Sequence, residues 1–309
     1  MTADPPGALV AAVDVGGTNI KAALMDDRHA TSRQVRRPTP AEGGPEAVLK
    51  EVASVLAELV DGCAVSVAGV VVPGVVDEAH AMAVYSGNLG WRDLDVPGWL
   101  HARTGLDIAF GHDVRAGALA EMVLGAAVGV DNLVFLPIGT GVAAAIVVDG
   151  RLLSGGGYVG EIGHLMVAPH NGSCVCGGHG CLETVASAGA IAARYRTAAG
   201  RPADAVTHAD TVVDLVRAGD PVARAVWTCA VDALADVLAA TTALVAPELI
   251  VIGGGLSQAG DLLLEPLRLG LAARLTVHRL PHVVGAALGD QAGCLGAGLL
   301  ALDLARSQS

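Results

Sequence analysis

The sequence predicts an α/β protein made of two domains with related topology. A pattern of apolar strand, glycine turn and second apolar strand occurs twice, in residues 9–25 and again in residues 133–148. The chain has 309 residues, which is long enough for two substantial cores. Because aromatic residues make up only 3% of a chain that is 52% hydrophobic, Val, Ala and Leu must build these cores. The 41 glycines favour close backbone packing in an α/β architecture.

The net charge, the N-terminal residues and the apolar runs argue against several classes of protein. A formal net charge of −12 argues against a nucleic-acid-binding surface, which needs a basic patch. The N-terminal residues MTADPPGALV lack a basic stretch followed by an apolar one, so no secretion signal is expected. Pro73, Pro137 and Gly139 interrupt the most apolar runs, so we expect no membrane span. These features predict a soluble, cytoplasmic protein.

The first hairpin places a polar turn between Leu9–Val13 and Ile20–Met25. The turn contains Asp14, Gly16, Gly17 and Thr18, and Lys21 follows it. Glycines in such a turn can present backbone N–H groups to a phosphate, while the threonine adds a hydroxyl and the lysine a positive charge. Glycine pairs are also common in plain hairpins, so the motif by itself leaves both interpretations open.

The second hairpin repeats this arrangement about one domain length later. Leu133–Ile138 is followed by Gly139, Thr140 and Gly141, and then by Val142–Val148. Two similar hairpins predict two domains that face a shared cleft and offer their glycine turns to one polyphosphate. The chain contains no GxxxxGK[ST] sequence, which excludes a P-loop enzyme.

The segment between the hairpins ends in a carboxylate of particular interest. Pro45–Asp61 has helical spacing, and Ala64–Val72 is a β-branched run typical of a buried parallel strand. Leu106–Phe110 predicts another strand, and a helix is expected to begin at Asp113. A carboxylate at the end of a strand and the start of a helix is favoured by the helix dipole and faces the ligand crevice of an α/β sheet. Asp is also a common helix N-cap, so both roles stay open at this point.

The stretch from residue 160 to residue 183 concentrates the polar chemistry of the chain. His164, Cys174, Cys176 and Cys181 have the spacing H-x9-C-x-C-x4-C, which is a ligand set for a tetrahedral zinc ion. Four protein ligands leave no position for water, so the zinc is expected to be structural. The alternative is a flexible loop with ordinary buried cysteines. We expect the metal to hold His164 and two nearby acids in fixed positions, namely Glu161 and Glu183.

The last third of the chain is expected to be mainly helical. A buried strand, Glu248–Ile252, runs into Gly253, Gly254 and Gly255, a turn suited to a nucleotide lying against exposed backbone or simply to a tight strand–helix connection. A closing helix is expected to return to the N-terminal domain. The expected domains are therefore residues 1–118 together with 291–309, and residues 119–290 with the zinc loop. Helices are predicted at Ala188–Ala198, Ala209–Arg217, Pro221–Val245, Asp261–Leu275 and Gln291–Ala305.

These segments, in this order, resemble the ROK family (repressors, uncharacterised proteins and sugar kinases). The resemblance extends from Val10 to Ala305 and implies the two-domain actin-like ATPase fold, which is related to ribonuclease H. Because only thirteen residues precede Asp14, we expect an enzyme rather than a DNA-binding repressor. The matching motifs are DVGGTNIK at 14–21 and PIGTG at 137–141 for phosphate, GEIGH at 160–164 with CVCGGHGCLE at 174–183, and IVIGGGLS at 250–257 for adenosine.

The resemblance implies ATP-dependent phosphorylation of a sugar hydroxyl, which in glucokinases is the 6-hydroxyl. Asp113 matches the catalytic base of the family, which accepts the proton of the attacking hydroxyl. Asp14 matches a residue that orients Mg²⁺ or its water. Members of the family are commonly dimers or tetramers, so the partners implied are a sugar, ATP and a second copy of the chain. The residues that match sugar-binding positions are Asn88, Glu161, His164 and Glu183, and His112 and Asp113 are expected to contact the sugar as well.

Two departures leave the substrate open. Members with glucose-type substrates read Asn-Asp where this chain reads His112-Asp113, and that asparagine contacts the sugar. Arg115 stands where the family commonly has Asn or another small residue. A neutral imidazole places its donor and acceptor on opposite sides of a ring and does not reproduce an amide contact with two adjacent hydroxyls. The alternatives to glucose are an N-acetylated amino sugar, mannose or allose, or a C7-cyclitol; a catalytically silent sugar sensor is a further one, and polyphosphate is an alternative donor.

Overall fold

The computed structural model describes residues 8–167, 169, 172–202, 205–206 and 208–308. The chain divides into two compact units: unit 1 is Met1–Val123 with Ser154–Val159 and Gln291–Ser309, and unit 2 is Leu124–Leu153 with Gly160–Asp290. The boundary expected at residue 118 lies inside a helix that continues to Leu124. Ser154–Val159 groups with unit 1 because Gly157 packs directly on its backbone, where an added Cβ would lie 2.5 Å from the carbonyl oxygen of Val76.

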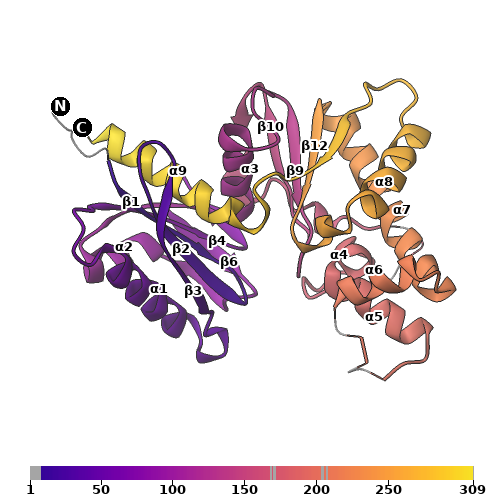
Figure 1. The fold of residues 1–309 in the computed structure, drawn as a ribbon, viewed down its shortest axis with the longest axis horizontal. Helices are drawn as coiled ribbons and strands as arrows, with labels where there is room; N and C mark the ends of the chain where they lie inside the picture. The colour runs from indigo at the N-terminus through magenta and orange to yellow at the C-terminus, as the bar shows by residue number, and fades with distance from the viewer. Residues whose placement is uncertain (1–7, 168, 170–171, 203–204, 207, 309) are drawn as a thin grey trace. The chain divides into compact units, whose positions relative to one another are not determined.

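The sheet of unit 1 has the strand order β3-β2-β1-β4-β8 (Figure 1). Its first three strands are antiparallel, and β1, β4 and β8 are parallel. The predicted hairpin is confirmed, with Asp14 opposite Lys21 in the register. A second, three-stranded antiparallel sheet follows β4; in it the buried Trp91 pairs with Ser86, and residues 87–90 form the turn between β6 and β7. The strands are β1 Val10–Val15, β2 Asn19–Met25, β3 Thr31–Pro38, β4 Val67–Val72 and β8 Asp107–His112, with β5 Val75–Asp77, β6 Met82–Ser86 and β7 Trp91–Leu94 in the second sheet.

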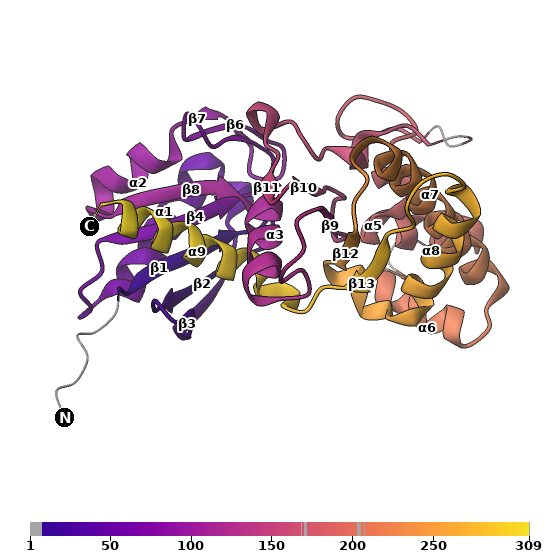
Figure 2. The ribbon, with the colours of Figure 1, turned by 90° about the horizontal axis from the view of Figure 1, so that it is seen from above.

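Two layers of helix cover the main sheet of unit 1. One face packs against α1 and α2 through large aliphatic side chains such as Val13, Val70 and Leu56. The other face packs against α9 through small residues, among them Ala12 and Ala297, so this helix lies close to the strands (Figures 1 and 2). In α3 the aliphatic Val123 is 42% exposed, whereas the charged Arg115 is buried. The helices are α1 Pro45–Val60, α2 Val96–Thr104, α3 Asp113–Leu124 and α9 Ala292–Ser307.

The sheet of unit 2 repeats the topology of the first sheet, in the order β11-β10-β9-β12-β13. Its first three strands are antiparallel, and β9, β12 and β13 are parallel. Two domains of related topology were expected from the repeated hairpins, and the sheets confirm this. The second strand of the hairpin is shorter than expected, and Val142 makes only an isolated bridge to Ile138. The strands are β9 Leu133–Pro137, β10 Ala145–Val148, β11 Arg151–Leu152, β12 Leu249–Gly253 and β13 His282–Gly285.

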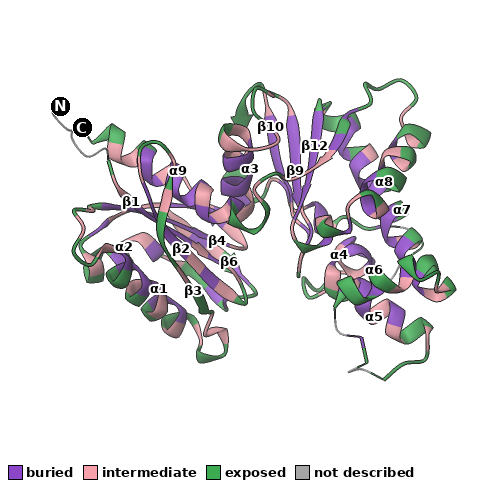
Figure 3. Cartoon of the chain, viewed as in Figure 1, coloured by how far each residue is buried: buried purple, intermediate pink, exposed green. Residues whose placement is uncertain are grey.

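The helices of unit 2 share one large core with its sheet, shown as the buried strands and helix faces of this unit in Figure 3. Helix α7 passes a length and composition test for a membrane span, which corrects the expectation that no run is long enough. Half of its most apolar window is buried, and residues such as Trp227 and Leu234 belong to the core of the unit. Helix α7 is therefore a core helix of unit 2 that resembles a membrane span in length and composition only. The helices are α4 Glu183–Ala186, α5 Ala188–Ala198, α6 Ala209–Arg217, α7 Pro221–Val245 and α8 Asp261–Arg274, with short 3-10 turns η3 Ile162–His164 and η4 Gly255–Ala259.

Candidate functional site

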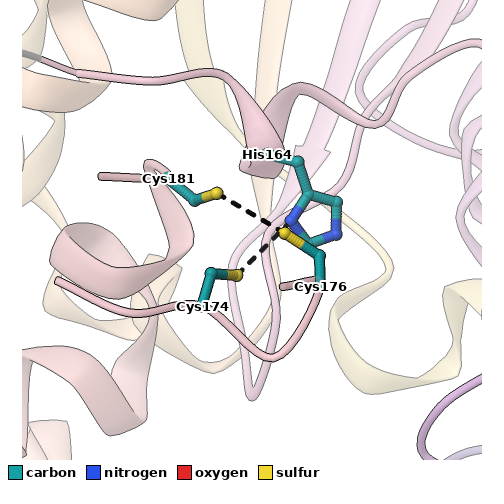
Figure 4. Close-up of side chains that lie close together, drawn as sticks. All are labelled: His164, Cys174, Cys176 and Cys181. Carbon is teal, nitrogen blue, oxygen red and sulfur yellow. Dashed lines mark hydrogen bonds between the residues drawn. The ribbon is translucent and has the colours of Figure 1, made fainter. Parts of the chain in front are cut away.

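The four predicted zinc ligands come together in unit 2 (Figure 4). Their ligand atoms all lie within 4.8 Å of one another. The Sγ atoms of Cys176 and Cys181 are 3.7 Å apart, as are Sγ of Cys174 and Nδ1 of His164. A tetrahedral zinc ion would separate two sulfurs by roughly 3.8 Å and a sulfur from a nitrogen by roughly 3.5 Å. The donor set and its spacing therefore fit a zinc ion, with Nδ1 as the imidazole ligand atom.

Backbone pairing brings the two ligand-bearing segments together. The N–H of Val167 donates to Gly180 O at 2.8 Å, and the N–H of Leu182 donates to Leu165 O at 2.9 Å. The N–H of Gly178 donates to Cys176 Sγ at 3.4 Å and lowers the pKa of that thiol. Burial raises the pKa of Cys181 to about 12, so this sulfur needs a nearby cation to be a thiolate at neutral pH.

The two acids beside the cluster have different partners. Nε2 of His164 faces Glu161 and lies 3.8 Å from its Oε2, on the side of the ring away from the sulfurs. A carboxylate in this place orients an imidazole that binds metal through its other nitrogen. Glu183 opens α4 and accepts the backbone N–H of Val142 at 2.9 Å. The carboxylate of Glu183 thus contacts the end of the second glycine turn.

The two glycine motifs of unit 2 lie against each other. Ile138, which precedes the turn Gly139–Gly141, donates its N–H to Gly253 O at 3.0 Å and accepts the N–H of Leu256 at 3.1 Å. Gly254 has φ of +71°, and an added Cβ would lie 2.4 Å from Ile138 O. Only glycine fits this close crossing. Thr140 and Gly255, one in each of these two motifs, are both exposed.

The first glycine turn is held by a residue that sequence reasoning missed. Thr39, directly after β3, donates its hydroxyl to Gly16 O at 2.6 Å and its N–H to Thr18 O at 2.9 Å. Gly17 and Thr18 are left exposed. Nothing local marks Thr39, because its partners lie more than twenty residues earlier in the chain. Asn88 also reaches this turn, since an added Cβ on Gly17 would lie 3.3 Å from its Cβ.

The carboxylate expected to orient Mg²⁺ lies at a helix end. Asp14 is in the last part of β1, and Gly293 in the first turn of α9 approaches it so closely that an added Cβ would lie 2.7 Å from Asp14 Oδ2. The amino end of a helix favours a negative charge. Lys21 pairs with Asp14 in the strand register. A carboxylate with a lysine beside it suits a phosphate-bound Mg²⁺ ion, which takes few protein ligands.

The expected catalytic base occupies the predicted strand–helix junction. Asp113 is the first residue of α3, and its Oδ1 accepts the N–H of Val114 at 2.7 Å. Nε2 of His112 lies 3.3 Å from the same oxygen. The side chain of His112 is only 5% exposed, and burial is the main cause that lowers its pKa. That His112 also contacts substrate directly stays a prediction.

Sequence reasoning also missed a second acid, Glu78, which binds both sides of this junction. Oε1 of Glu78 accepts the backbone N–H of His112 at 3.1 Å and Nε of Arg115 at 3.0 Å. Arg115 is 2% exposed and donates through Nη2 to Val76 O at 2.8 Å. Arg115, at a position where the family commonly has Asn or another small residue, was the only sign of this acid in the sequence. Once buried, an arginine requires a carboxylate partner.

Comparison with known proteins gives consistent matches over the full length. The sequence profile of the ROK family matches residues 10–304. A glucokinase of Thermotoga maritima is 34% identical over 305 residues, covering 92% of this chain and 94% of the relative. An N-acetylmannosamine kinase of Salmonella typhimurium is 33% identical over 297 residues, covering 94% and 97%. The crystal structure of a ROK family glucokinase from Streptomyces griseus with glucose and AMPPNP matches with a TM-score of 0.84 at 28% identity, covering 96% of this chain and 99% of that one.

Proposed function

Because the chain belongs to the ROK family, we propose that it is an ATP-dependent hexose kinase of the glucokinase type. It transfers the γ-phosphoryl group of ATP to the primary hydroxyl of glucose. The observation that carries this proposal is the half-exposed carboxylate of Asp113 at the β8–α3 junction, oriented on one oxygen by Val114 and His112. A carboxylate fixed in this way is suited to accept the proton of an attacking hydroxyl.

In this mechanism the positioning of reactants supplies most of the rate enhancement, because phosphoryl transfer needs little covalent chemistry from the protein. Asp113 removes the proton of the sugar hydroxyl as its oxygen attacks phosphorus. The glycine turns at 16–18, 139–141 and 253–255 present backbone N–H groups to ATP, and Lys21 adds a positive charge. Glu161, His164, Glu183 and Asn88 bind the sugar hydroxyls.

Two metals are part of this proposal. Mg²⁺ neutralises the phosphates when bound, and Asp14 would hold it or its water. A structural zinc ion bound by His164, Cys174, Cys176 and Cys181 fixes the loop that carries Glu161 and Glu183. We further infer that the protein is cytoplasmic and that it forms a homodimer or homotetramer.

A second candidate is a kinase for a related polyol. The N-acetylmannosamine kinase of Salmonella typhimurium is almost as similar to this chain as the glucokinase of Thermotoga maritima. His112 and Arg115 replace the residues expected of a glucose-specific member. An N-acetylated amino sugar, mannose, allose or a C7-cyclitol is therefore the alternative acceptor, and a catalytically silent sugar sensor is the alternative class.

A coupled ADP-release assay over a panel of these acceptors, with ATP and polyphosphate as donors, distinguishes the candidates. Fast turnover of glucose supports the glucokinase, and another preferred acceptor supports the second candidate. Asp113→Asn should lower kcat by several orders of magnitude with little change in substrate binding. Asp107→Asn, at the far end of the same strand, is the matched control. A variant Asp113→Asn with more than about a tenth of the normal kcat would refute general-base catalysis by this residue.

A further inference from the structure

The side chains around the β8–α3 junction form one connected cluster, made of Glu78, His112, Asp113 and Arg115. A single oxygen, Oε1 of Glu78, accepts from the residue before Asp113 and from Arg115 in the first turn of α3. Arg115 is in turn fixed by its bond to Val76 O. Both flanks of Asp113 are therefore held by one acid–arginine pair, in which Arg115 is buried and Glu78 is partly exposed, and the backbone at this point is fixed by it.

The imidazole of His112 has one polar partner. Its Nε2 lies 3.3 Å from Oδ1 of Asp113, while Nδ1 is buried and has no hydrogen-bond partner among the residues that the structure describes. Burial lowers the pKa of His112, although Asp113 and Glu78 oppose this and Arg115 adds to it. The ring is therefore neutral and carries one proton. Since an ionised carboxylate only accepts, that proton is on Nε2.

We propose that His112 is a positioning residue for the general base, an inference that rests on the proposed kinase activity. Nε2 of His112, 3.3 Å from Oδ1 of Asp113, lies beside the oxygen that accepts the N–H of Val114, and together they restrain this side of the carboxylate and leave Oδ2 to take the proton. In the reaction the O–H bond of the sugar hydroxyl breaks and its oxygen forms a bond to the γ-phosphorus. The bond between that phosphorus and ADP breaks, and the proton on Oδ2 later passes to water.

This role differs measurably from that of a histidine that merely fills the core. Loss of the Nε2–H donor lets the Asp113 carboxylate rotate, which lowers the rate of the chemical step but leaves ground-state binding intact. We expect His112→Leu to reduce kcat by about tenfold to hundredfold, with KM for sugar and ATP changed less than about twofold. His112→Gln keeps an N–H donor near the place of Nε2 and should retain most of kcat. His101→Leu, in α2 of the same unit, is the control and should leave kcat unchanged; its ring bonds to the carbonyl of Leu106.

The test combines kinetics of the full chain with NMR of histidine labelled with ¹⁵N. In the spectrum of the wild type, the signal that His112→Leu removes should belong to a neutral ring protonated on Nε2. In the Asp113→Asn background, His112→Leu should cause no further loss of the residual kcat, because the two side chains act as one unit. Both results together support the proposal.

Three outcomes would overturn the proposal: an Nδ1–H tautomer, equal loss of kcat in the Leu and Gln variants of His112, or an undiminished effect of His112→Leu in the Asp113→Asn background. Failure of the proposed function is recognised separately. A wild-type protein that phosphorylates no member of the acceptor panel refutes the kinase, whereas the tautomer measurement tests the pairing of His112 with Asp113 without any activity.

Discussion

The two glycine turns occupy equivalent places in two similar sheets, yet different groups hold them. In unit 1 a neutral hydroxyl and a backbone N–H of Thr39 bind the carbonyls of Gly16 and Thr18. In unit 2 the carboxylate of Glu183 binds the N–H of Val142, and Ala188 donates to Gly139 O at 2.9 Å. The first turn is thus held by hydrogen bonds to its carbonyls. The second turn is held by a hydrogen bond to a carbonyl and by a carboxylate that accepts an N–H.

The residues that hold the two turns come from different parts of the structure. Thr39 directly follows the third strand of the sheet that contains the first turn, so this turn needs only its own sheet. Glu183 opens α4 two residues after Cys181, the last member of the His/Cys cluster. We therefore expect the geometry of the second turn, but not that of the first, to depend on whether the cluster holds a metal ion. Four experiments test this difference between the two glycine turns.

Loss of zinc should have the largest effect. Elemental analysis should find one zinc per chain, and Cys176→Ser should lower kcat/KM by about tenfold or more because the cluster braces the residues beside it. Hydrogen exchange should become faster at the Val142 amide, while the Thr39 amide keeps its protection. Cys63→Ser, which changes a half-buried thiol of unit 1, is the control. A metal-free protein with full activity would remove the link between cluster and turn.

Loss of the Glu183 acceptor should come next. In Glu183→Leu the N–H of Val142 loses a charge-assisted hydrogen bond, and the free energy of unfolding should fall by about 1.5–3 kcal/mol. Glu183→Gln keeps an acceptor oxygen and should lose less. Urea unfolding of both variants without ligands measures this separately from any role in sugar binding. Equal stability of the Leu and Gln variants would contradict the contact with Val142.

Loss of the Thr39 hydroxyl should have a smaller effect that is confined to the first turn. Thr39→Val removes one neutral hydrogen bond, which contributes about 1 kcal/mol, and should raise KM for ATP severalfold with KM for the sugar unchanged. Thr39→Ser restores the hydroxyl and should behave like the wild type. The idea fails if the Val and Ser variants have the same KM for ATP.

A pair of glycine substitutions should have the smallest effect. An added Cβ at Gly141 would lie 2.8 Å from Glu183 Oε2, whereas one at Gly139 meets nothing within 4 Å. Gly141→Ala should displace the carboxylate and lower the unfolding free energy by less than about 1 kcal/mol, because a side-chain end can move aside. Gly139→Ala should be neutral or stabilise by up to about 1 kcal/mol through lower chain entropy in the unfolded state. Thermal unfolding of the two variants compares them directly, and a larger loss at Gly139 would count against the contact.

Local sequence patterns were sufficient to predict much of the fold. Helical spacing predicted α5, α6 and α7 with the bounds that the structure has, and α1 to within one residue. The hairpins and the His/Cys cluster were also predictable, because each depends on residues that are close in sequence. The short strands β5 to β7 were missed, since their pattern is too brief to distinguish from a loop until Trp91 is seen to be buried.

The class of fold, the His/Cys cluster and the place of Asp113 could thus be predicted from the amino-acid sequence, because local periodicity and contiguous motifs encode all three. Which side chains hold them in place became clear only from the folded structure. Arg115 and Glu78 are 37 residues apart, and Glu183 and Val142 are 41 apart, so no local pattern relates them. Such pairs form only when sheet topology brings distant segments together, and a buried arginine or a backbone N–H then takes the carboxylate that the fold supplies.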